Sequence, residues 1–139
     1  MKLIGLDIGE KRIGVARANS DVRLAAPYGT LSNDEHIFQK IADLVDNEKV
    51  ETVVVGLPRN SMGEETKQSD YVRNFMASLK LTVPVYFQDE SLTSVLAEEQ
   101  LQGNKKPYEK NDIDSRAAVL ILNDYLERNF DGKSRNNNR

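Results

Sequence analysis

The sequence predicts an α/β protein with a mixed five-stranded sheet, in the order 3-2-1-4-5, in which strand 2 is antiparallel and helices cover both faces. Two observations support this prediction. Three strand-like segments joined by short turns come first, and helical and strand-like segments then alternate. Because strand-to-strand crossovers through a helix are right-handed, the fourth strand can pair beside the first. The first strand is then central.

The amino-terminal part of the chain predicts three strands and a helix. Residues 3–8 form an apolar run broken only by Gly5 and Asp7, which is typical of a strand covered on both faces. A hairpin turn at residues 9–11 leads into a strand at 12–18, and a third strand lies within 24–31. Residues 32–35 match a capping box, which predicts a helix with apolar residues at positions 37, 41, 44 and 45.

The remaining chain predicts two strands and three helices. Residues 52–57 form a second apolar strand, and residues 83–87 form a shorter one. Apolar residues at positions 72, 75, 76 and 79 place a helix between these strands. Two further helices are expected at about 93–101 and 112–128. The sequence therefore predicts one domain over residues 1–131, followed by a disordered polar tail at 132–139.

Composition restricts the possible location and metal chemistry. The 139 residues are 39% hydrophobic and 29% charged, which suits a globular domain with a core. No apolar run approaches the roughly 20 residues that span a bilayer, and the opening residues lack a signal-peptide pattern, so we expect a cytoplasmic protein without membrane contact. With no cysteine and a single histidine, His36, which we expect at the surface, any metal would be bound by oxygen.

Asp7 is the most informative residue, because it interrupts an apolar strand. A carboxylate between Leu6 and Ile8, in a strand buried on both faces, is costly unless something pairs with it. It could cap a turn or pair with Lys11 or Arg12. A metal-binding or catalytic role is the favoured interpretation.

Two other acidic positions are ambiguous when each is considered alone. Asp89 and Glu90 follow the predicted strand at 83–87, where acids often cap a helix or face solvent. Asp112 and Asp114 fall in the first turn of the last predicted helix, where the helix dipole favours acidic residues whether or not they have a function. Position alone does not assign a function to either pair.

Topology brings these acids together. A strand centre, a strand end and a helix start can converge on one edge of such a sheet. With Glu90 two strands from Asp7, their backbones are roughly 10 Å apart, which leaves room for cations between the side chains. Crowded carboxylates repel each other unless a cation neutralises them, and magnesium prefers such oxygen ligands. We therefore expect a magnesium site formed by Asp7 and one acid from each of the other two positions.

At this point the sequence resembles the YqgF family of Holliday-junction-resolvase-like proteins and pre-16S ribosomal RNA nucleases. The resemblance covers almost the whole chain. It rests on Gly5-Leu6-Asp7-Ile8-Gly9 with Arg12-Ile13-Gly14-Val15-Ala16, on Val54-Val55-Gly56-Leu57-Pro58-Arg59-Asn60 with Gly63, on Asp89-Glu90, and on Asp114-Ser115 with Ala117-Ala118.

The resemblance implies a ribonuclease H-like nuclease. Asp7, Glu90 and Asp114 match the family's three catalytic acids, and Thr93 continues a family motif that implies a substrate contact. One departure is Ser91, where the family usually has arginine. If that arginine contacts substrate phosphate in relatives, Arg59 or Arg116 could compensate here.

The implied mechanism is hydrolysis of a phosphodiester with two metal ions, Mg²⁺ or Mn²⁺, about 3.5 to 4 Å apart, one activating water and the other stabilising the leaving oxygen. Five basic residues would position the nucleic-acid backbone: Lys11, Arg12, Arg59, Lys105 and Lys106. The formal net charge of −3 is unusual for a nucleic-acid binder, so the distribution of charge must provide the contact surface.

The expected substrate is structured RNA, in 5′-end processing of pre-16S rRNA on pre-ribosomal particles, by a monomer or weak homodimer. Resolution of a DNA Holliday junction is the second hypothesis, and it would require a dimer to cut two strands. A non-catalytic RNA- or ribosome-binding module is the third. The sugar-kinase and actin-like ATPase fold also starts with an Asp-x-Gly turn but needs two domains, and tight ATP binding would revive it.

Overall fold

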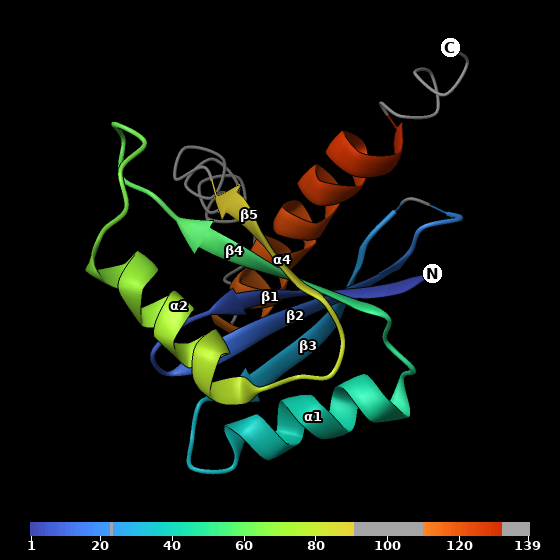
Figure 1. The fold of residues 1–139 in the computed structure, drawn as a ribbon, viewed down its shortest axis with the longest axis horizontal. Helices are drawn as coiled ribbons and strands as arrows, with labels where there is room; N and C mark the ends of the chain where they lie inside the picture. The colour runs from blue at the N-terminus through green and yellow to red at the C-terminus, as the bar shows by residue number, and fades with distance from the viewer. Residues whose placement is uncertain (23, 91–109, 132–139) are drawn as a thin grey trace.

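Five strands form one mixed sheet in the predicted order, β3-β2-β1-β4-β5 (Figure 1). The computed structural model describes residues 1–22, 24–90 and 110–131, with side chains described for 115–129 of the last segment. Strand β2 pairs antiparallel with β1 and β3, whereas β4 runs parallel to β1 and β5. The strands are β1 (Lys2–Ile8), β2 (Arg12–Asn19), β3 (Ala26–Ser32), β4 (Thr52–Pro58) and β5 (Val85–Glu90).

Helices cover both faces of this sheet, as predicted (Figure 1). Helices α1 (Ile37–Asn47) and α2 (Lys67–Leu79) pack on one face. Helix α4 (Lys110–Leu126), extended by a π-helical turn η1 (Glu127–Asp131), packs on the other. None of the helices in the described ranges is long and apolar enough to span a membrane. The helix predicted at about 93–101 lies outside the described residues.

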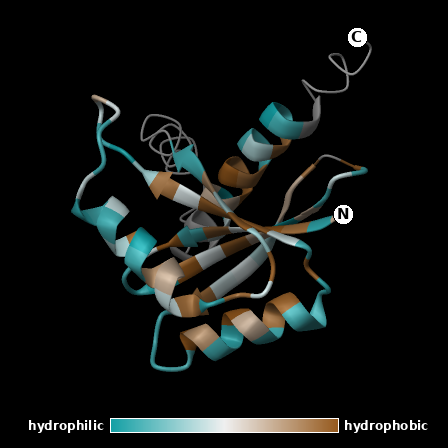
Figure 2. Ribbon diagram, viewed as in Figure 1, coloured by the Kyte–Doolittle hydropathy of each residue, from teal (hydrophilic) through white to brown (hydrophobic). Residues whose placement is uncertain are grey.

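Alternation along the strands divides the core into two layers. Ile4, Leu6 and Ile8 of β1 pack under α1 and α2, whereas Leu3 packs under α4. Figure 2 shows hydrophobic residues along the central strands and both hydrophobic and hydrophilic residues along the helices. Because successive side chains of a strand point to opposite faces, Gly5 and Asp7 face α4. The central strand therefore directs its single acid toward the layer that α4 covers.

Helix α4 approaches β1 closely at Gly5. A Cβ atom at this position would lie 3.0 Å from Leu122 Cβ and 3.1 Å from the Ala118 carbonyl oxygen. Ala118 and Leu122 are fully buried, so neither can move freely. The missing side chain at Gly5 sets the distance between helix and sheet.

The outer edge of β3 is irregular. Pro27 lies within the strand, and Gly29 has a φ of +153°. The register between β2 and β3 shifts between Val15 and Ala16, as in a β-bulge. The edge therefore lacks the regular hydrogen-bonding pattern of β1.

Three predicted boundaries are wrong. The capping box at residues 32–35 does not form, because Ser32 ends β3 and α1 begins at Ile37, after a turn in which the Asp34 carboxylate accepts the His36 N–H at 2.9 Å. His36 is exposed, as expected. Strand β5 extends to Glu90, because its pairing with β4 continues that far. Helix α4 is already formed at Lys110, so Asp114 is not in the first turn.

Replacing Gly5 with alanine should destabilise the protein, because the added Cβ forces α4 away from β1. We expect Gly5→Ala to lower the free energy of unfolding by about 1 to 3 kcal/mol, the usual cost of overpacking a core. Ser61→Ala, in an exposed loop, is the control and should change it by less than about 0.5 kcal/mol. Urea denaturation of both variants measures the difference, and equal midpoints would contradict the argument.

Candidate active site

Asp7 lies near the carboxyl end of β1, on the face covered by α4. It is partly exposed, although Leu6 and Ile8 beside it are buried. Its partner on β2 is Gly14. On the other side, the register that pairs Leu6 with Val55 places Asp7 level with Gly56 of β4. Asp7 therefore has a glycine beside it on both neighbouring strands, which leaves space around the carboxylate.

The Glu90 carboxylate occupies the space above Gly56. A Cβ at Gly56 would lie 2.7 Å from Glu90 Oε1 and 2.9 Å from Ile121 Cγ1, and would also contact Ile121 Cδ1. Glu90 is the last residue of β5, and its side chain leans back over β4. Burial raises the pKa of the Glu90 carboxyl above its ordinary value of 4.5. Asp7 and Glu90 therefore lie on the same face of the sheet. The strand between them, β4, has no side chain at this level because the residue there is Gly56.

The third predicted acid, Asp114, is placed by its helix backbone. The Ala118 carbonyl lies over Gly5, and residue 114 is one helical turn earlier. The four residues from 118 back to 114 advance about 6 Å along the helix, and the two residues from Gly5 to Asp7 advance about 6.6 Å along the strand. Ile121 lies over Gly56, whereas Tyr125 stacks on Tyr86 farther back, so α4 runs against the direction of β4 and β5. The helix therefore carries Asp114 toward the end of the sheet where Asp7 and Glu90 lie.

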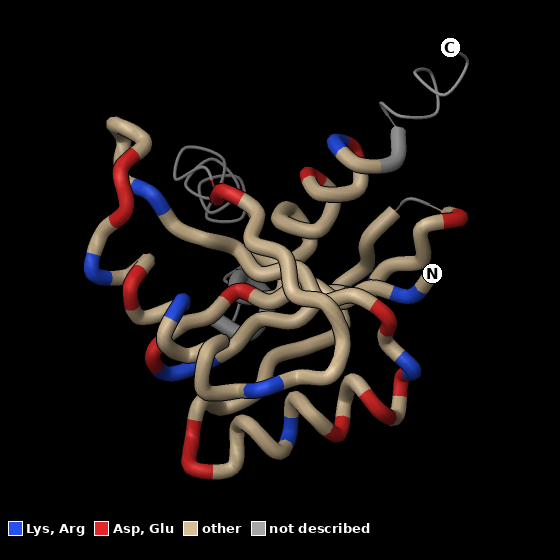
Figure 3. Tube along the Cα trace, in the orientation of Figure 1, with Lys and Arg blue, Asp and Glu red and all other residues tan. Residues whose placement is uncertain are grey.

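The predicted basic residues do not all share this face. Lys11 is exposed in the turn after β1, and Arg12 begins β2 on the α4 side, opposite the orientation of Ile13. Arg116 is exposed on α4. Thr93, Lys105 and Lys106 lie outside the described residues. Figure 3 shows Lys and Arg interspersed with Asp and Glu rather than forming one basic face.

Arg59 is directed elsewhere. Its Nε donates to Asp89 Oδ1 at 2.9 Å, and its Nη1 donates to the Gly63 carbonyl at 3.1 Å. Since Asp89 and Glu90 are successive strand residues, they point to opposite faces of the sheet. The structure therefore does not bring Arg59 together with Asp7 and Glu90.

Side-chain hydrogen bonds fix the end of β1, and the sequence patterns did not predict them. Asn33 Nδ2 donates to the Gly9 carbonyl at 2.8 Å and to the Tyr71 hydroxyl at 2.8 Å. Gln68 Nε2 donates to the Ile8 carbonyl at 3.2 Å. These bonds connect the turn after Asp7 to the loop before α1 and to α2, so they hold the carboxylate's backbone in place.

The described carboxylates suit a hard cation. Among residues whose side chains are described, which leave out Asp114, no three Asp, Glu or His side chains form a metal cluster. The pair of Asp7 and Glu90, however, provides oxygen ligands in a space bounded by glycines. A cation between them would offset the cost of keeping Glu90 charged while buried. The residues present therefore fit a magnesium ion that a third acid would help to hold.

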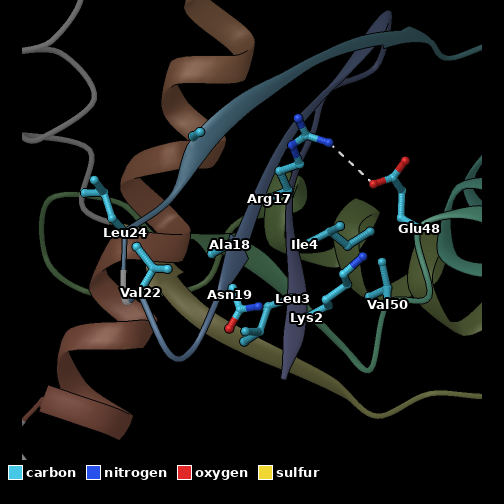
Figure 4. Close-up of a pocket in the computed structure, with 11 residues that line it drawn as sticks. Lys2, Leu3, Ile4, Arg17, Ala18, Asn19, Val22, Leu24, Glu48 and Val50 are labelled. Carbon is cyan, nitrogen blue, oxygen red and sulfur yellow. Dashed lines mark hydrogen bonds and ion pairs between the residues drawn. The ribbon is translucent and has the colours of Figure 1, made fainter.

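An apolar hollow lies away from these acids. It has a volume of about 330 Å³, and it is lined by the first residues of β1, the end of β2, the following loop and the segment after α1 (Figure 4). An Arg17–Glu48 ion pair of 3.4 Å crosses its rim. None of the predicted site residues that the structure describes lines it, so we do not assign the hollow to the candidate active site.

Burial of Glu90 predicts a dependence of stability on pH. Because its pKa is raised, the folded protein keeps this proton above pH 4.5, where the unfolded chain has lost it. The resulting stability is complete below about pH 4.5 and is lost as pH rises through the folded-state pKa. Glu90→Gln stays neutral, so in a chelator at pH 7 it should melt at a higher temperature than the wild type.

Thermal unfolding between pH 4 and pH 8 tests this prediction, and the difference in melting temperature should shrink toward pH 4. Asp89→Asn is the matched control, because its carboxylate is exposed and pairs with Arg59. It should not raise the melting temperature. A Glu90→Gln protein no more stable than the wild type at pH 7 would refute the argument.

Solved structures show the same fold. A T. thermophilus RuvC in complex with a Holliday junction substrate aligns with a TM-score of 0.56 and 15% identity, over 92% of this chain and 94% of that one. The fowlpox virus Holliday junction resolvase aligns with a TM-score of 0.53 and 15% identity, over 92% and 99%. The predicted ribonuclease H-like fold is therefore confirmed.

Sequence comparison identifies the family. A protein from Sulfurihydrogenibium sp. (strain YO3AOP1), provisionally named a pre-16S rRNA nuclease, is 44% identical over 131 residues, which cover 91% of this chain and 90% of that protein. A protein of the same name from Chloroflexus aurantiacus is 43% identical, over 90% and 86%. The family model described as RuvX, Holliday junction resolvase, matches residues 1–128. The chain therefore belongs to the RuvX family of nucleases.

Proposed function

We propose that this protein is a divalent-metal-dependent nuclease that processes the 5′ end of pre-16S rRNA, with Asp7, Glu90 and Asp114 as its metal-binding carboxylates. The observation that supports this most directly is the Glu90 carboxylate above Gly56, one strand from Asp7. Two acids facing one space are costly in a protein that does not bind a cation. In a nuclease they are the oxygen ligands that the reaction needs.

Mg²⁺ or Mn²⁺ bound by these acids would activate water and stabilise the leaving oxygen of a phosphodiester. The chain's own residues determine where that chemistry takes place. Asp7 is fixed by its central strand, and the Asn33 and Gln68 bonds hold the adjacent turn. Gly14 and Gly56 keep space open beside Asp7.

Binding of the substrate backbone is assigned to the basic residues near this end of the sheet. Lys11 lies in the turn after β1, Arg12 begins β2 on the α4 side, and Arg116 is exposed on α4, so each is proposed to contact phosphates. We retain Thr93, Lys105 and Lys106 as proposed contacts. Arg59 could reach substrate from the other face only by releasing Asp89.

RNA is favoured over DNA because the curated relatives carry the name of a pre-16S rRNA nuclease. This substrate would place the protein in the cytoplasm, on pre-ribosomal particles. We also propose that residues 1–131 form the nuclease domain and that residues 132–139 are a polar tail. The described helices provide no membrane span.

Holliday junction resolution is the second candidate, and the family description and the likeness to RuvC favour it. A resolvase must cut two strands symmetrically, so it should be a dimer. Sedimentation that detects only monomers at working concentration would argue against it. The non-catalytic binding module is the third candidate, and it predicts that the acids can be replaced without loss of function.

The first experiment is cleavage of precursor rRNA, short RNA, single-stranded DNA and a four-way junction, with magnesium or with chelator. Asp7→Asn and Glu90→Gln should each slow cleavage by at least about 100-fold, a typical cost of losing one electrostatic contact to the transition state. Asp89→Asn is the matched control, since it removes an adjacent acid that faces away, and it should retain activity. Absence of cleavage of every substrate would leave the binding module as the better hypothesis.

Gly56→Ala tests the geometry rather than the ligands. The added methyl would occupy the position of Glu90 Oε1 and contact Ile121, so the carboxylate must move. We expect the magnesium concentration for half-maximal cleavage to rise by about 10- to 100-fold, as when a residue that orients a metal ligand is removed. Ser61→Ala, in an exposed loop, is the control and should leave the magnesium requirement unchanged. An unchanged magnesium requirement would contradict the assigned position of Glu90.

A further inference from the structure

Three residues of β5 share the face that carries the acids. Tyr86 stacks on Tyr125 of α4, and Glu90 lies over Gly56 beside Ile121 of the same helix. By alternation, Gln88 between them faces α4 as well. Phe87 faces the opposite side, where Arg73 lies 5.1 Å from its ring. The strand thus presents an aromatic ring, an amide and a carboxylate in line.

Tyr86 is an unusual residue for this position because it is open to solvent. Its side chain is 48% exposed, although it lies on a strand face that α4 covers elsewhere. The Tyr125 ring is 5.9 Å away at an interplanar angle of 29°, so it holds Tyr86 in a fixed orientation. No charged residue occurs between positions 85 and 88, and Figure 3 shows this stretch of β5 without charge. A rigid, neutral and exposed ring is a good stacking surface.

Gln88 provides an independent observation. Gln88 is only 7% exposed. Its side-chain amide forms no hydrogen bond with the part of the chain that the structure describes. Buried polar groups are nearly always hydrogen-bonded, so an unpaired one in a native structure requires an explanation. Gln88 pairs in register with Gly56, directly beside the space that holds the Glu90 carboxylate. Its amide therefore has unused hydrogen-bonding capacity beside this space.

We propose that Tyr86 and Gln88 form a subsite for an unpaired nucleobase of the substrate, with Tyr86 stacking on the base and the Gln88 amide forming a hydrogen bond to the same nucleotide. This inference rests on the proposed nuclease function and adds a requirement for an unpaired nucleotide near the cut. Tyr86 and Glu90 are about 13 Å apart along the strand.

The base must be unpaired because the faces of a base within a helix are covered by its neighbours. Stacking on aromatic rings is typical of single-stranded nucleic acid and of unpaired ends and loops. Such stacking does not depend on the identity of the base. The subsite would therefore select a cleavage position by the structure of the RNA rather than by its sequence.

The test uses the full-length chain and a short single-stranded RNA that carries the fluorescent base 2-aminopurine at successive positions. Binding is measured in the Asp7→Asn background, and cleavage is measured with Asp7 intact. We expect one position of the probe to be quenched on binding. Tyr86→Ala should abolish that quenching and weaken binding by about 5- to 150-fold, the range for loss of one stacked base.

Matched variants separate stacking from folding. Tyr86→Phe keeps the ring and should bind as the wild type does. Tyr28→Ala, on β3, removes a tyrosine of similar exposure, 42%, at the far edge of the sheet and should change nothing. In cleavage, Tyr86→Ala should raise KM and leave kcat unchanged, because the ring does not contact the reacting atoms.

Gln88→Leu gives a readout that a structural role would not produce. Removing an unpaired buried amide should raise the melting temperature while it weakens RNA binding. If the Tyr86→Ala protein binds RNA and quenches the probe as the wild type does, and still cleaves RNA, the subsite inference is overturned and the nuclease function stands. Loss of binding by Tyr86→Phe would overturn stacking. A wild-type chain that neither binds nor cuts RNA would overturn both proposals.

Discussion

Close packing of α4 on the glycines of the central strands is the constraint on which the rest of the site depends. At Gly5 the backbone of α4 lies so close to the sheet that a methyl group would not fit between them. At Gly56 the space that a side chain would fill is occupied by Ile121 and the Glu90 carboxylate. The helix is thereby fixed in height and direction above β1 and β4. Its first described turns then extend toward the end of the sheet that carries Asp7. Glycine is needed here for close approach rather than for an unusual φ.

The sheet order and the central acid could be predicted from the sequence, because both follow from short-range pattern. An apolar run with one carboxylate identifies β1 and Asp7 without knowledge of any other segment. The end of β5 could not be predicted in this way, since it depends on pairing between Pro58 and Glu90, which are far apart along the chain. The same holds for Arg59, whose pairing with Asp89 depends on β4 and β5 lying side by side.

The role of the glycines shows a second limit of sequence patterns. A glycine within a strand can indicate a bulge, a turn or a close contact, and the pattern does not distinguish these. Only the register places Gly14 and Gly56 on either side of Asp7. The acids were recognised because their chemistry is conspicuous, whereas the space that they require is formed by residues without side chains. The wrong start of α1 has a related cause, since a capping box competes with a strand that extends through Ser32.

The irregular edge of β3 has a consequence for self-association. A regular edge strand is a template on which a second chain can add its own strand. Pro27 has no N–H to donate, Gly29 departs from extended geometry, and the bulge opposite Ala16 distorts the register. Copies of this protein should therefore not join their sheets across β3, and strand-mediated aggregation should not begin at this edge. A functional dimer would have to form through helices or through other surfaces.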